Sequence, residues 1–414
     1  MRILSGAAAR ARVRKIAARG SRYSEVEPLV RRIIADVRKQ GDRALRKYAE
    51  RWDDLRTQES LQVSEEQIHA AWKSATRELR TSMRTAAANI RRFCERQKPA
   101  EWTRTRNGIT VGQIVRPLDS VGCYVPGGRY PLISTLLMTV VPAQVAGVQN
   151  IRVVSPQPRA EVLAAAGMLE LREIYRVGGA QAVAALAYGT ESIPRVDKIV
   201  GPGNLYVTAA KQLVSFDCAI DFLAGPTEVV IVSDTGKPEF IAADLVAQSE
   251  HDPEALAVFI TTRDDLAGKV ARAAQKLSQE NMVAKQSLRR NGIILVSDSH
   301  RQSFEWANDL APEHLTVDAT DDVALVHNAG SVFVGGYSPQ AAGDYAAGPN
   351  HVLPTGGAAR FRGGLGVLDF VKLISVQRLS RPGLKQIAAV VESLANAEGL
   401  RAHAESIRTR FGHA

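Results

Sequence analysis

The chain has 414 residues, enough for two ordinary domains that each bury a core. Its 45% hydrophobic and 23% charged residues are typical of globular proteins, and no apolar run approaches the roughly 20 residues that span a bilayer. Three scattered cysteines (Cys94, Cys123 and Cys218) argue against a disulfide framework or a cysteine-built zinc site. We therefore expect a protein of a reducing compartment, by default the cytoplasm, with no membrane partner.

Basic residues are concentrated at the start of the sequence. The net charge is +10, and the first 100 residues carry 24 Lys and Arg against 12 Asp and Glu. A basic segment can bind nucleic acid, but here apolar residues such as Val30, Ile33 and Val37 recur at helical spacing. Solvated helix faces explain the charge, and no nucleic-acid-binding motif accompanies it. Residues 1–20 contain arginines and no acid, and we interpret them as an N-terminal arm rather than a secretory signal.

From about residue 150, short β-rich runs alternate with helical patterns. The runs predict strands at 151–155, 174–177, 197–201, 228–234, 256–261 and 292–296. The patterns between them predict helices near 160–171, 238–250, 264–278 and 299–310. This alternation builds parallel sheets covered on both faces, and there is too much of it for one sheet. We expect two α/β units, followed by a tail of two helical patterns broken near Asn396–Gly399.

Glycine-rich turns follow or precede several of these strands. They read "VPGGRYP", "VGGAQA", "GPGN" and "LAGPTE", whereas the G-x-G-x-x-G dinucleotide fingerprint stands in no convincing place. Such turns indicate a ligand crevice at the carboxyl ends of the strands, without naming the ligand. Cys123 lies beside the first turn, and we interpret it as a buried thiol because no histidine follows nearby to activate it.

Polar residues form a second pattern. "NDLAPEHL" places Glu313 beside His314 after a proline, where a loop can turn both side chains towards one substrate; a solvated surface pair is the alternative. Gln248 and His251 share one face of a predicted helix end. Two further histidines have an acid nearby in the sequence: His351 follows Asp344, and His403 follows Glu398. Together they suit zinc, or manganese, in a site assembled from distant segments, although each histidine alone could simply cap or hydrogen bond.

Eight motifs then match a known family, together and in order. They are "CYVPGGRYPL", "GGAQAVAALAYGTE", "GPGN", "AGPTEVVIVSD", "AQSEHDP", "APEHL", "GDYAAGPNHVLPT" and "EGLRAHAES". With them the chain closely resembles the histidinol dehydrogenase family from about residue 25 to its C-terminus. The resemblance implies a zinc- and NAD-dependent enzyme of the last two steps of histidine biosynthesis. Such an enzyme oxidises L-histidinol to L-histidine through L-histidinaldehyde and uses two NAD.

The resemblance also implies the role of each site residue. Glu313 and His314 match the catalytic pair. The positions that bind one zinc ion per subunit are Gln248, His251, Asp344 and His403, with His403 expected from the partner subunit's tail. The substrate-binding positions are Thr227, Gln248, His251, His314, Asp344, His351, Glu398 and His403. The NAD-binding positions are Tyr124, Gln181 and Asn204. Thr227 often stands as serine in the family, a change that keeps the hydroxyl.

The implied fold is α/β, with two incomplete Rossmann-like domains built on parallel sheets, an N-terminal arm and a helical C-terminal tail. The first domain is expected to span residues 21–125 and 229–365 and to carry the catalytic and zinc residues. The second, inserted at 126–228, provides the NAD side. The tail, 366–414, is expected to be exchanged in a homodimer.

A two-step oxidation of a primary alcohol would use both adjacent bases, Glu313 and His314. Oxidising a primary alcohol to a carboxylate takes two hydride transfers, with hydration of the aldehyde between them. We predict that His314 is the base in the alcohol and gem-diol oxidations, because histidine titrates near neutral pH. Glu313 in a partly desolvated pocket is predicted to activate the water. Zinc is expected to hold the substrate's amine and imidazole nitrogens.

Two other readings stay open at this point. The chain could be a paralogue that oxidises another polar primary alcohol, since specificity is not read reliably from a few side chains. A zinc hydrolase could also use Glu313 as its base, but Tyr124, Gln181 and Asn204 would then have no role.

Overall fold

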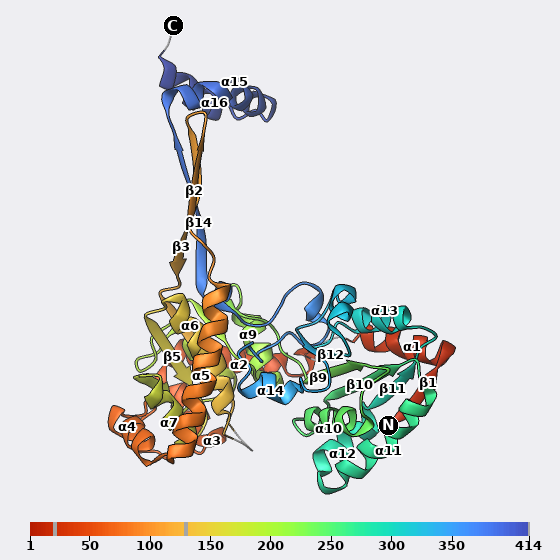
Figure 1. Ribbon diagram of the computed structural model, residues 1–414. Coiled ribbons are helices and arrows are strands. Elements are labelled where there is room, and N and C mark those ends of the chain that lie inside the picture. The colour runs from red at the N-terminus through yellow and green to blue at the C-terminus, as the bar shows by residue number, and fades with distance from the viewer. Residues whose placement is uncertain (20–22, 128–130, 413–414) are drawn as a thin grey trace. The chain divides into compact units, whose positions relative to one another are not determined.

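In the computed structural model of the protein, residues 1–19, 23–127 and 131–412 are described (Figure 1). The chain forms two compact units, Met1–Gln97 with Leu118–Phe370, and Lys98–Pro117 with Val371–Ala414. The first unit contains two parallel sheets with helices on their faces, which confirms the predicted α/β class. Within the described ranges, no helix combines the length and the apolar character that crossing a membrane requires.

One sheet of the first unit has six parallel strands in the order β1-β11-β10-β9-β12-β13. The strands are β1 (Arg2–Ser5), β9 (Glu228–Val232), β10 (Leu256–Thr261), β11 (Ile293–Val296), β12 (His314–Val317) and β13 (Ser331–Val334). The helices beside them are α1 (Gly6–Ala17), α10 (Pro238–Ser249), α11 (Asp264–Leu277), α12 (Met282–Arg290) and α13 (His300–Leu310). Val230 and Val258 face α1 and α13, whereas Val229 and Phe259 face the other three helices. Both faces are therefore buried, as strands without polar alternation require.

The other sheet has five parallel strands in the order β6-β5-β4-β7-β8. The strands are β4 (Ser120–Tyr124), β5 (Asn150–Val154), β6 (Glu173–Tyr175), β7 (Lys198–Val200) and β8 (Ala219–Ile220). Its connecting helices are α6 (Ile133–Ala146), α7 (Ala160–Met168), α8 (Gly179–Tyr188) and α9 (Leu205–Val214). The predicted strand–helix alternation is thus present, but it begins at β4, thirty residues earlier than the sequence pattern suggested.

The N-terminal quarter differs from the expected boundaries. Residues 2–5 form β1, which pairs in parallel with β11, so the predicted arm contributes an edge strand and a helix to the six-stranded sheet. The next helices are α2 (Glu27–Gln40), α3 (Asp42–Trp52), α4 (Glu65–Ser74) and α5 (Arg77–Gln97). The first two bury Val30, Ile33 and Leu45 in one cluster with α8 of the five-stranded sheet. This segment was expected with the first domain, and its apolar stripe instead packs on the second sheet.

Short helices fill several connections of the first unit. They are α14 (Gln340–Tyr345) and the 3₁₀ segments η1 (Tyr23–Glu25), η2 (Ser278–Glu280), η3 (Thr320–Leu325), η4 (Ala358–Arg360) and η5 (Val367–Phe370). Of these, α14 carries Asp344, one of the residues expected to bind zinc.

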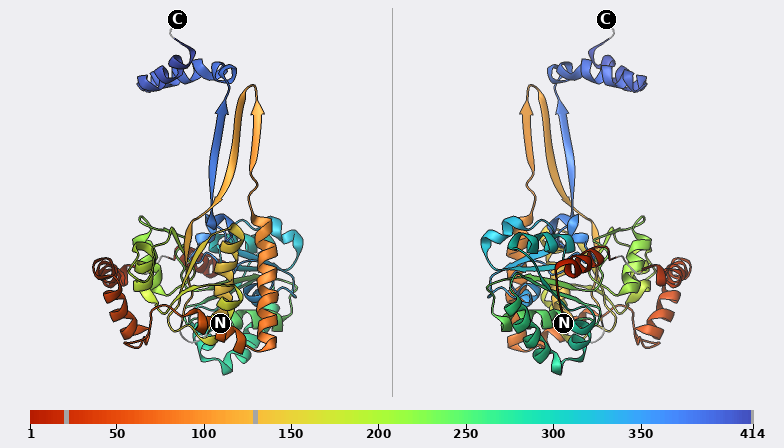
Figure 2. Two further views of the ribbon diagram at one scale, coloured as in Figure 1. Left: turned by 90° about the vertical axis from the view of Figure 1, so that its left-hand side faces the viewer. Right: turned by 90° about the vertical axis from the view of Figure 1, so that its right-hand side faces the viewer.

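The second unit is an antiparallel sheet followed by helices. Its strands are β2 (Trp102–Arg106), β3 (Ile109–Pro117) and β14 (Val371–Leu379), in the order β14-β3-β2 (Figure 2). Asn107 and Gly108 link β2 to β3, and both have positive φ, as a two-residue hairpin turn requires. The helical tail was predicted over residues 366–414, but residues 371–379 of it form β14. Its helices are α15 (Arg381–Ala397) and α16 (Arg401–Arg408), with the 3₁₀ segment η6 (Thr409–Phe411) after them. Gly399, at φ +76°, lies in the break between them.

Candidate active site

The Glu313–His314 pair lies where α13 gives way to β12. Ala311 caps α13 in the left-handed region at φ 46°, and Pro312 follows it, so the helix stops at Leu310. His314 is the first residue of β12 and pairs with Val229 of β9, which places the pair beside Thr227 and Glu228. Both segments stand at the amino ends of their parallel strands. The "LAGPTE" turn thus lies at the edge opposite to the one that the glycine turns led us to expect.

Glu313 is buried, at 7% exposure, and its carboxylate is held from one side. Oε2 accepts hydrogen bonds from the Thr227 hydroxyl at 2.5 Å and from the Glu228 backbone N–H at 2.8 Å. Both donors stabilise the ionised carboxylate. The solvated surface pair that "NDLAPEHL" also allowed is therefore excluded for Glu313.

His314 is only 2% exposed, and its two ring nitrogens differ. Nδ1 lies 3.1 Å from the Glu228 carbonyl, which can only accept, so a hydrogen on Nδ1 donates to it. Nε2 lies 3.4 Å from Asp344 Oδ1 and, within the described residues, has no hydrogen-bond partner. The Phe333 ring stacks on the imidazole at 5.8 Å. Nε2 is consequently the nitrogen available for proton transfer.

Opposing effects set the protonation of His314. Burial lowers its pKa, but the carboxylates of Glu313 and Asp344 outweigh burial and raise the pKa to about 10. At that value the ring would stay protonated at neutral pH. A cation bound near Asp344 would weaken this preference for the protonated ring.

Asp344 joins this pair to the other expected zinc residues. Burial would raise its pKa, yet His314, and at longer range His351 and His251, lower it below the ordinary value. The Asp344 carbonyl lies 2.7 Å from His351 Nδ1. Gln248, near the end of α10, contacts the Thr227 hydroxyl and lies 3.4 Å from His314 Nδ1, in both cases through Nε2. The structure thus brings the Gln248 amide, the Asp344 carboxylate and the His314 and His351 imidazoles into one network of contacts.

The donor chemistry fits zinc, but one chain does not complete the set. Gln248, His251 and Asp344 supply the amide, imidazole and carboxylate groups that zinc or manganese accepts. Across the described ranges, no three His, Cys, Asp or Glu side chains are placed to hold a metal ion. Glu398, at the end of α15, and His403, in α16, belong to the second unit and are exposed. Of these two, only His403 was expected to bind the metal, and Glu398 was expected to contact the substrate.

A pocket of about 510 Å³ lies at the carboxyl ends of β4 to β7. All three residues expected to bind NAD line it, Tyr124 at the end of β4, Gln181 in α8 and Asn204 before α9. Its other lining residues are Leu29, Ile33, Trp52, Asp53, Pro126, Gly127, Pro156, Gln157, Gly179, Ala180 and Tyr206. Three of the four glycine turns therefore meet at one pocket, as open α/β sheets commonly arrange them.

Polar contacts fix the wall of this pocket. Asp53 accepts hydrogen bonds from Gly178 N at 2.9 Å and from Gln181 Nε2 at 3.1 Å, and burial raises its pKa. The Tyr124 hydroxyl accepts from Gly179 N at 2.9 Å. Sequence reasoning missed Asp53, which stands in "RWDDL" with no motif around it and meets Gln181 only through the tertiary fold.

Cys123 has no place in the chemistry. Its side chain is fully buried in β4, and burial raises the pKa of the thiol to about 12. A thiol held neutral at that value is a poor nucleophile, so the predicted role of a small buried side chain is confirmed.

Replacing Gln181 with alanine is expected to raise the KM for NAD while kcat at saturating NAD changes little. The amide supplies one hydrogen bond to Asp53, and losing one such bond corresponds to about a two- to tenfold change in affinity. Initial rates at varied NAD concentration measure the KM. The control is Gln212→Ala, a substitution of an exposed glutamine in α9. An unchanged KM would contradict the assignment of this pocket.

Comparisons with known proteins identify the family of the chain. A family model described as histidinol dehydrogenase matches residues 17–411. The histidinol dehydrogenase of Methanothermobacter thermautotrophicus is 47% identical over 394 residues, 92% of each chain, and that of Methanosarcina barkeri is 44% identical over 97% of this chain and 96% of its own. The crystal structure of histidinol dehydrogenase from Elizabethkingia anophelis superposes with a TM-score of 0.94 at 34% identity, covering 99% of this chain and 98% of that one. The chain belongs to the histidinol dehydrogenase family.

Proposed function

We propose that this NAD-dependent enzyme oxidises L-histidinol to L-histidine through L-histidinaldehyde, with zinc bound and two NAD reduced per turnover. The observation that carries the proposal is the buried Glu313–His314 pair. Two bases of different chemistry stand side by side, and each bonds a different backbone atom of Glu228. A reaction with two oxidations and one hydration on the same carbon uses both.

The residues divide the proton transfers as follows. His314 Nε2 takes the hydroxyl proton while hydride leaves the carbinol carbon for NAD. Glu313 then takes a proton from the water that attacks the aldehyde carbon, His314 returns its proton to the carbonyl oxygen, and the gem-diol forms. His314 accepts one gem-diol proton as the second hydride leaves for the second NAD, which gives the carboxylic acid, and loss of its proton to solvent gives the carboxylate. Each oxidation releases two electrons as hydride, so the sequence balances at four.

We assign the metal to Gln248, His251 and Asp344 of one chain with His403 of the partner subunit. When bound, zinc supplies a Lewis acid that holds the amine and imidazole nitrogens of the substrate and can polarise the reacting oxygen. Thr227, His351 and Glu398 complete the substrate contacts, together with His314 and the metal ligands. NAD occupies the pocket of Tyr124, Gln181 and Asn204.

A homodimer with exchanged tails would supply His403 and Glu398 to the site. This part of the proposal is supported by apolar side chains exposed on the second unit. They are Trp102, Val111, Leu373, Ile374, Val376, Val390, Leu394 and Leu400. We place the enzyme in the cytoplasm, which fits its three free, buried cysteines.

The stoichiometry with and without metal tests the proposal. Purified, zinc-loaded protein given L-histidinol and NAD is expected to form two NADH for each histidine. Chelation should abolish this activity, because the metal that holds the substrate's amine and imidazole nitrogens is removed. Added zinc should restore it. Absorbance of NADH and chromatography of the amino-acid product measure both quantities.

Other outcomes would redirect the assignment. Tight NAD binding without turnover of L-histidinol would point to a paralogue that oxidises another polar alcohol, and a panel of such alcohols would follow. Absence of NAD binding would instead remove the dehydrogenase chemistry altogether.

A further inference from the structure

Arg19 forms a buried ion pair behind the candidate catalytic residues. Its Nε and Nη2 donate to the two carboxylate oxygens of Glu228 at 2.8 and 2.7 Å, a bidentate geometry. The Glu228 side chain is 4% exposed and that of Arg19 is 20% exposed. Arg19 lies two residues beyond the end of α1, so a side chain of the N-terminal segment reaches the start of β9.

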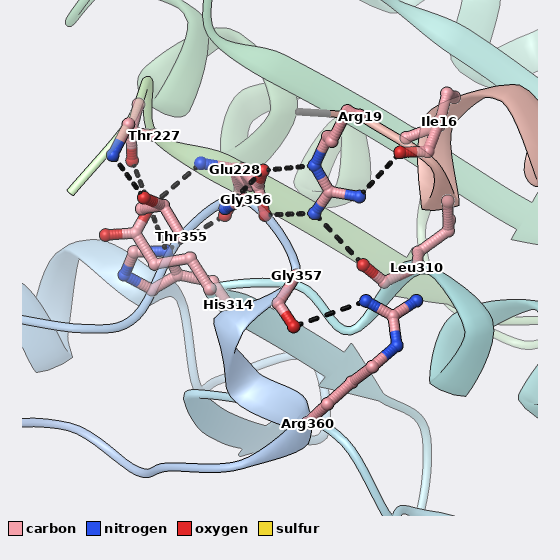
Figure 3. A network of polar contacts seen from close by, with 12 residues as sticks. Ile16, Arg19, Thr227, Glu228, Leu310, His314, Thr355, Gly356, Gly357 and Arg360 are labelled. Atoms are coloured by element: carbon pink, nitrogen blue, oxygen red, sulfur yellow. Dashed lines mark hydrogen bonds and ion pairs between the residues drawn. The ribbon is translucent and has the colours of Figure 1, made fainter. Parts of the chain in front are cut away.

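Glu228 in turn contacts both members of the pair through its backbone. Its N–H donates to Glu313 Oε2 at 2.8 Å, and its carbonyl lies 3.1 Å from His314 Nδ1 (Figure 3). Its side chain also accepts from Gly356 N at 3.1 Å. The orientation of both bases therefore depends on where one peptide segment lies.

Arg19 also holds the segment that leads into the pair. Nη2 donates to the Leu310 carbonyl at 3.0 Å, and Nη1 donates to the Ile16 carbonyl at 2.9 Å. Leu310 is the last residue of α13, three residues before Glu313. Figure 3 shows the guanidinium between Glu228 and Leu310. The Arg19 side chain thus links Glu228, at the start of β9, to Leu310, at the end of α13 just before the two bases.

The charge of Arg19 matters as much as its hydrogen bonds. Burial raises the pKa of Glu228, Arg19 lowers it, and the nearby Glu313 carboxylate raises it again. In the part of the chain that the structure describes, Glu228 forms its ion pair with Arg19 alone. Without the guanidinium, the Glu228 carboxylate would stay buried near Glu313 with no cationic partner of its own, and it would have to move or take up a proton.

We propose that Arg19 is a positioning residue of the catalytic pair, acting through Glu228 and Leu310. The inference rests on the proposed function, since it assigns a role within that reaction. Arg19 contacts neither Glu313 nor His314 directly in the geometry above. Its effect should therefore appear in kcat for both oxidation steps and leave the KM for NAD unchanged, because the NAD pocket belongs to the other sheet.

The test compares Arg19→Ala and Arg19→Lys with Arg10→Ala. Arg10 lies in the same helix region and forms an exposed ion pair with Asp298, so it controls for loss of a charge. We expect Arg19→Ala to lower kcat about 100-fold, the scale of a small misplacement of reacting groups. Arg19→Lys should fall between it and the wild type because an ammonium keeps the charge but lacks the planar fork that bonds Glu228 and Leu310 together. Guanidinium at non-denaturing concentration should restore activity to Arg19→Ala and leave Arg10→Ala unchanged.

Hydrogen exchange separates this inference from the proposed function. Peptides covering residues 308–316 should exchange faster in Arg19→Ala than in wild type, whatever the substrate proves to be. A wild type that releases no NADH from L-histidinol would refute the proposed function, and this exchange would still decide the role of Arg19. Unchanged exchange together with wild-type kcat in folded Arg19→Ala would overturn the inference, as would an equal loss in Arg10→Ala.

Should Arg19→Ala fail to fold, the double variant Arg19→Met, Glu228→Gln removes both charges and leaves no unpaired carboxylate. We expect this protein to fold, as judged by circular dichroism, and to retain the reduced kcat because the link to Leu310 is lost. Full activity in the folded double variant would overturn the positioning role.

Discussion

Replacing His314 with asparagine is expected to lower kcat for L-histidinol oxidation by about 10²–10⁴-fold, the usual contribution of a general base. Asparagine can still meet the Glu228 carbonyl with its amide N–H, but it has no ring nitrogen that accepts the proton at the position of Nε2. Both oxidation steps should slow together, because both remove a hydroxyl proton. Stopped-flow NADH absorbance with L-histidinol, and separately with L-histidinaldehyde, measures the two steps.

His327 offers the matched control for that substitution. It is an exposed histidine in the connection before β13, and His327→Asn should leave both rates unchanged. A loss confined to the first oxidation in His314→Asn would mean that another group serves the gem-diol.

Replacing Glu313 with glutamine is expected to stall the aldehyde step by about 10²–10⁴-fold while the alcohol step slows far less. The amide oxygen can still accept from Thr227 and from Glu228 N–H, so the local packing is retained. It cannot take the proton of the attacking water, however. The variant should therefore release one NADH per histidinol instead of two, and semicarbazide should trap the accumulated aldehyde.

An exposed glutamate of α13 controls for the loss of a carboxylate. Glu305 pairs with Arg301 on the helix surface, and Glu305→Gln should behave as wild type. If Glu313→Gln slowed the alcohol and aldehyde steps equally, the proposed division of roles between the two bases would be incorrect.

Strands with continuous β-branched and apolar runs were predictable from the sequence. The run at 256–261 coincides with β10, and that at 292–296 includes β11. By contrast, β1 is a four-residue strand in a basic segment, and only its pairing with β11 makes it a strand. The Asn107–Gly108 dipeptide did carry a hairpin signal, which the sequence analysis did not use.

The site, too, contains residues that the sequence identifies and residues that only the tertiary fold brings together. Glu313 and His314 are neighbours in a distinctive motif, so the sequence identifies them as a pair. Arg19 and Glu228 are 209 residues apart, and neither lies in a pattern that requires the other. Their contact follows from β1 and α1 packing on the six-stranded sheet. Asp53 is comparable, because it reaches Gln181 across 128 residues. Such partners become visible only once the tertiary fold is known.

The second unit has almost no interior of its own. In its described part, every buried residue is a glycine, an alanine or a threonine, and none of its large apolar side chains is buried. Too little apolar surface is removed from water there to offset the entropy lost in ordering the chain. In the proposed dimer, metal binding would therefore depend on association of the two chains. Each chain would hold part of the coordination sphere, and association would stabilise the tail that carries the remaining ligand.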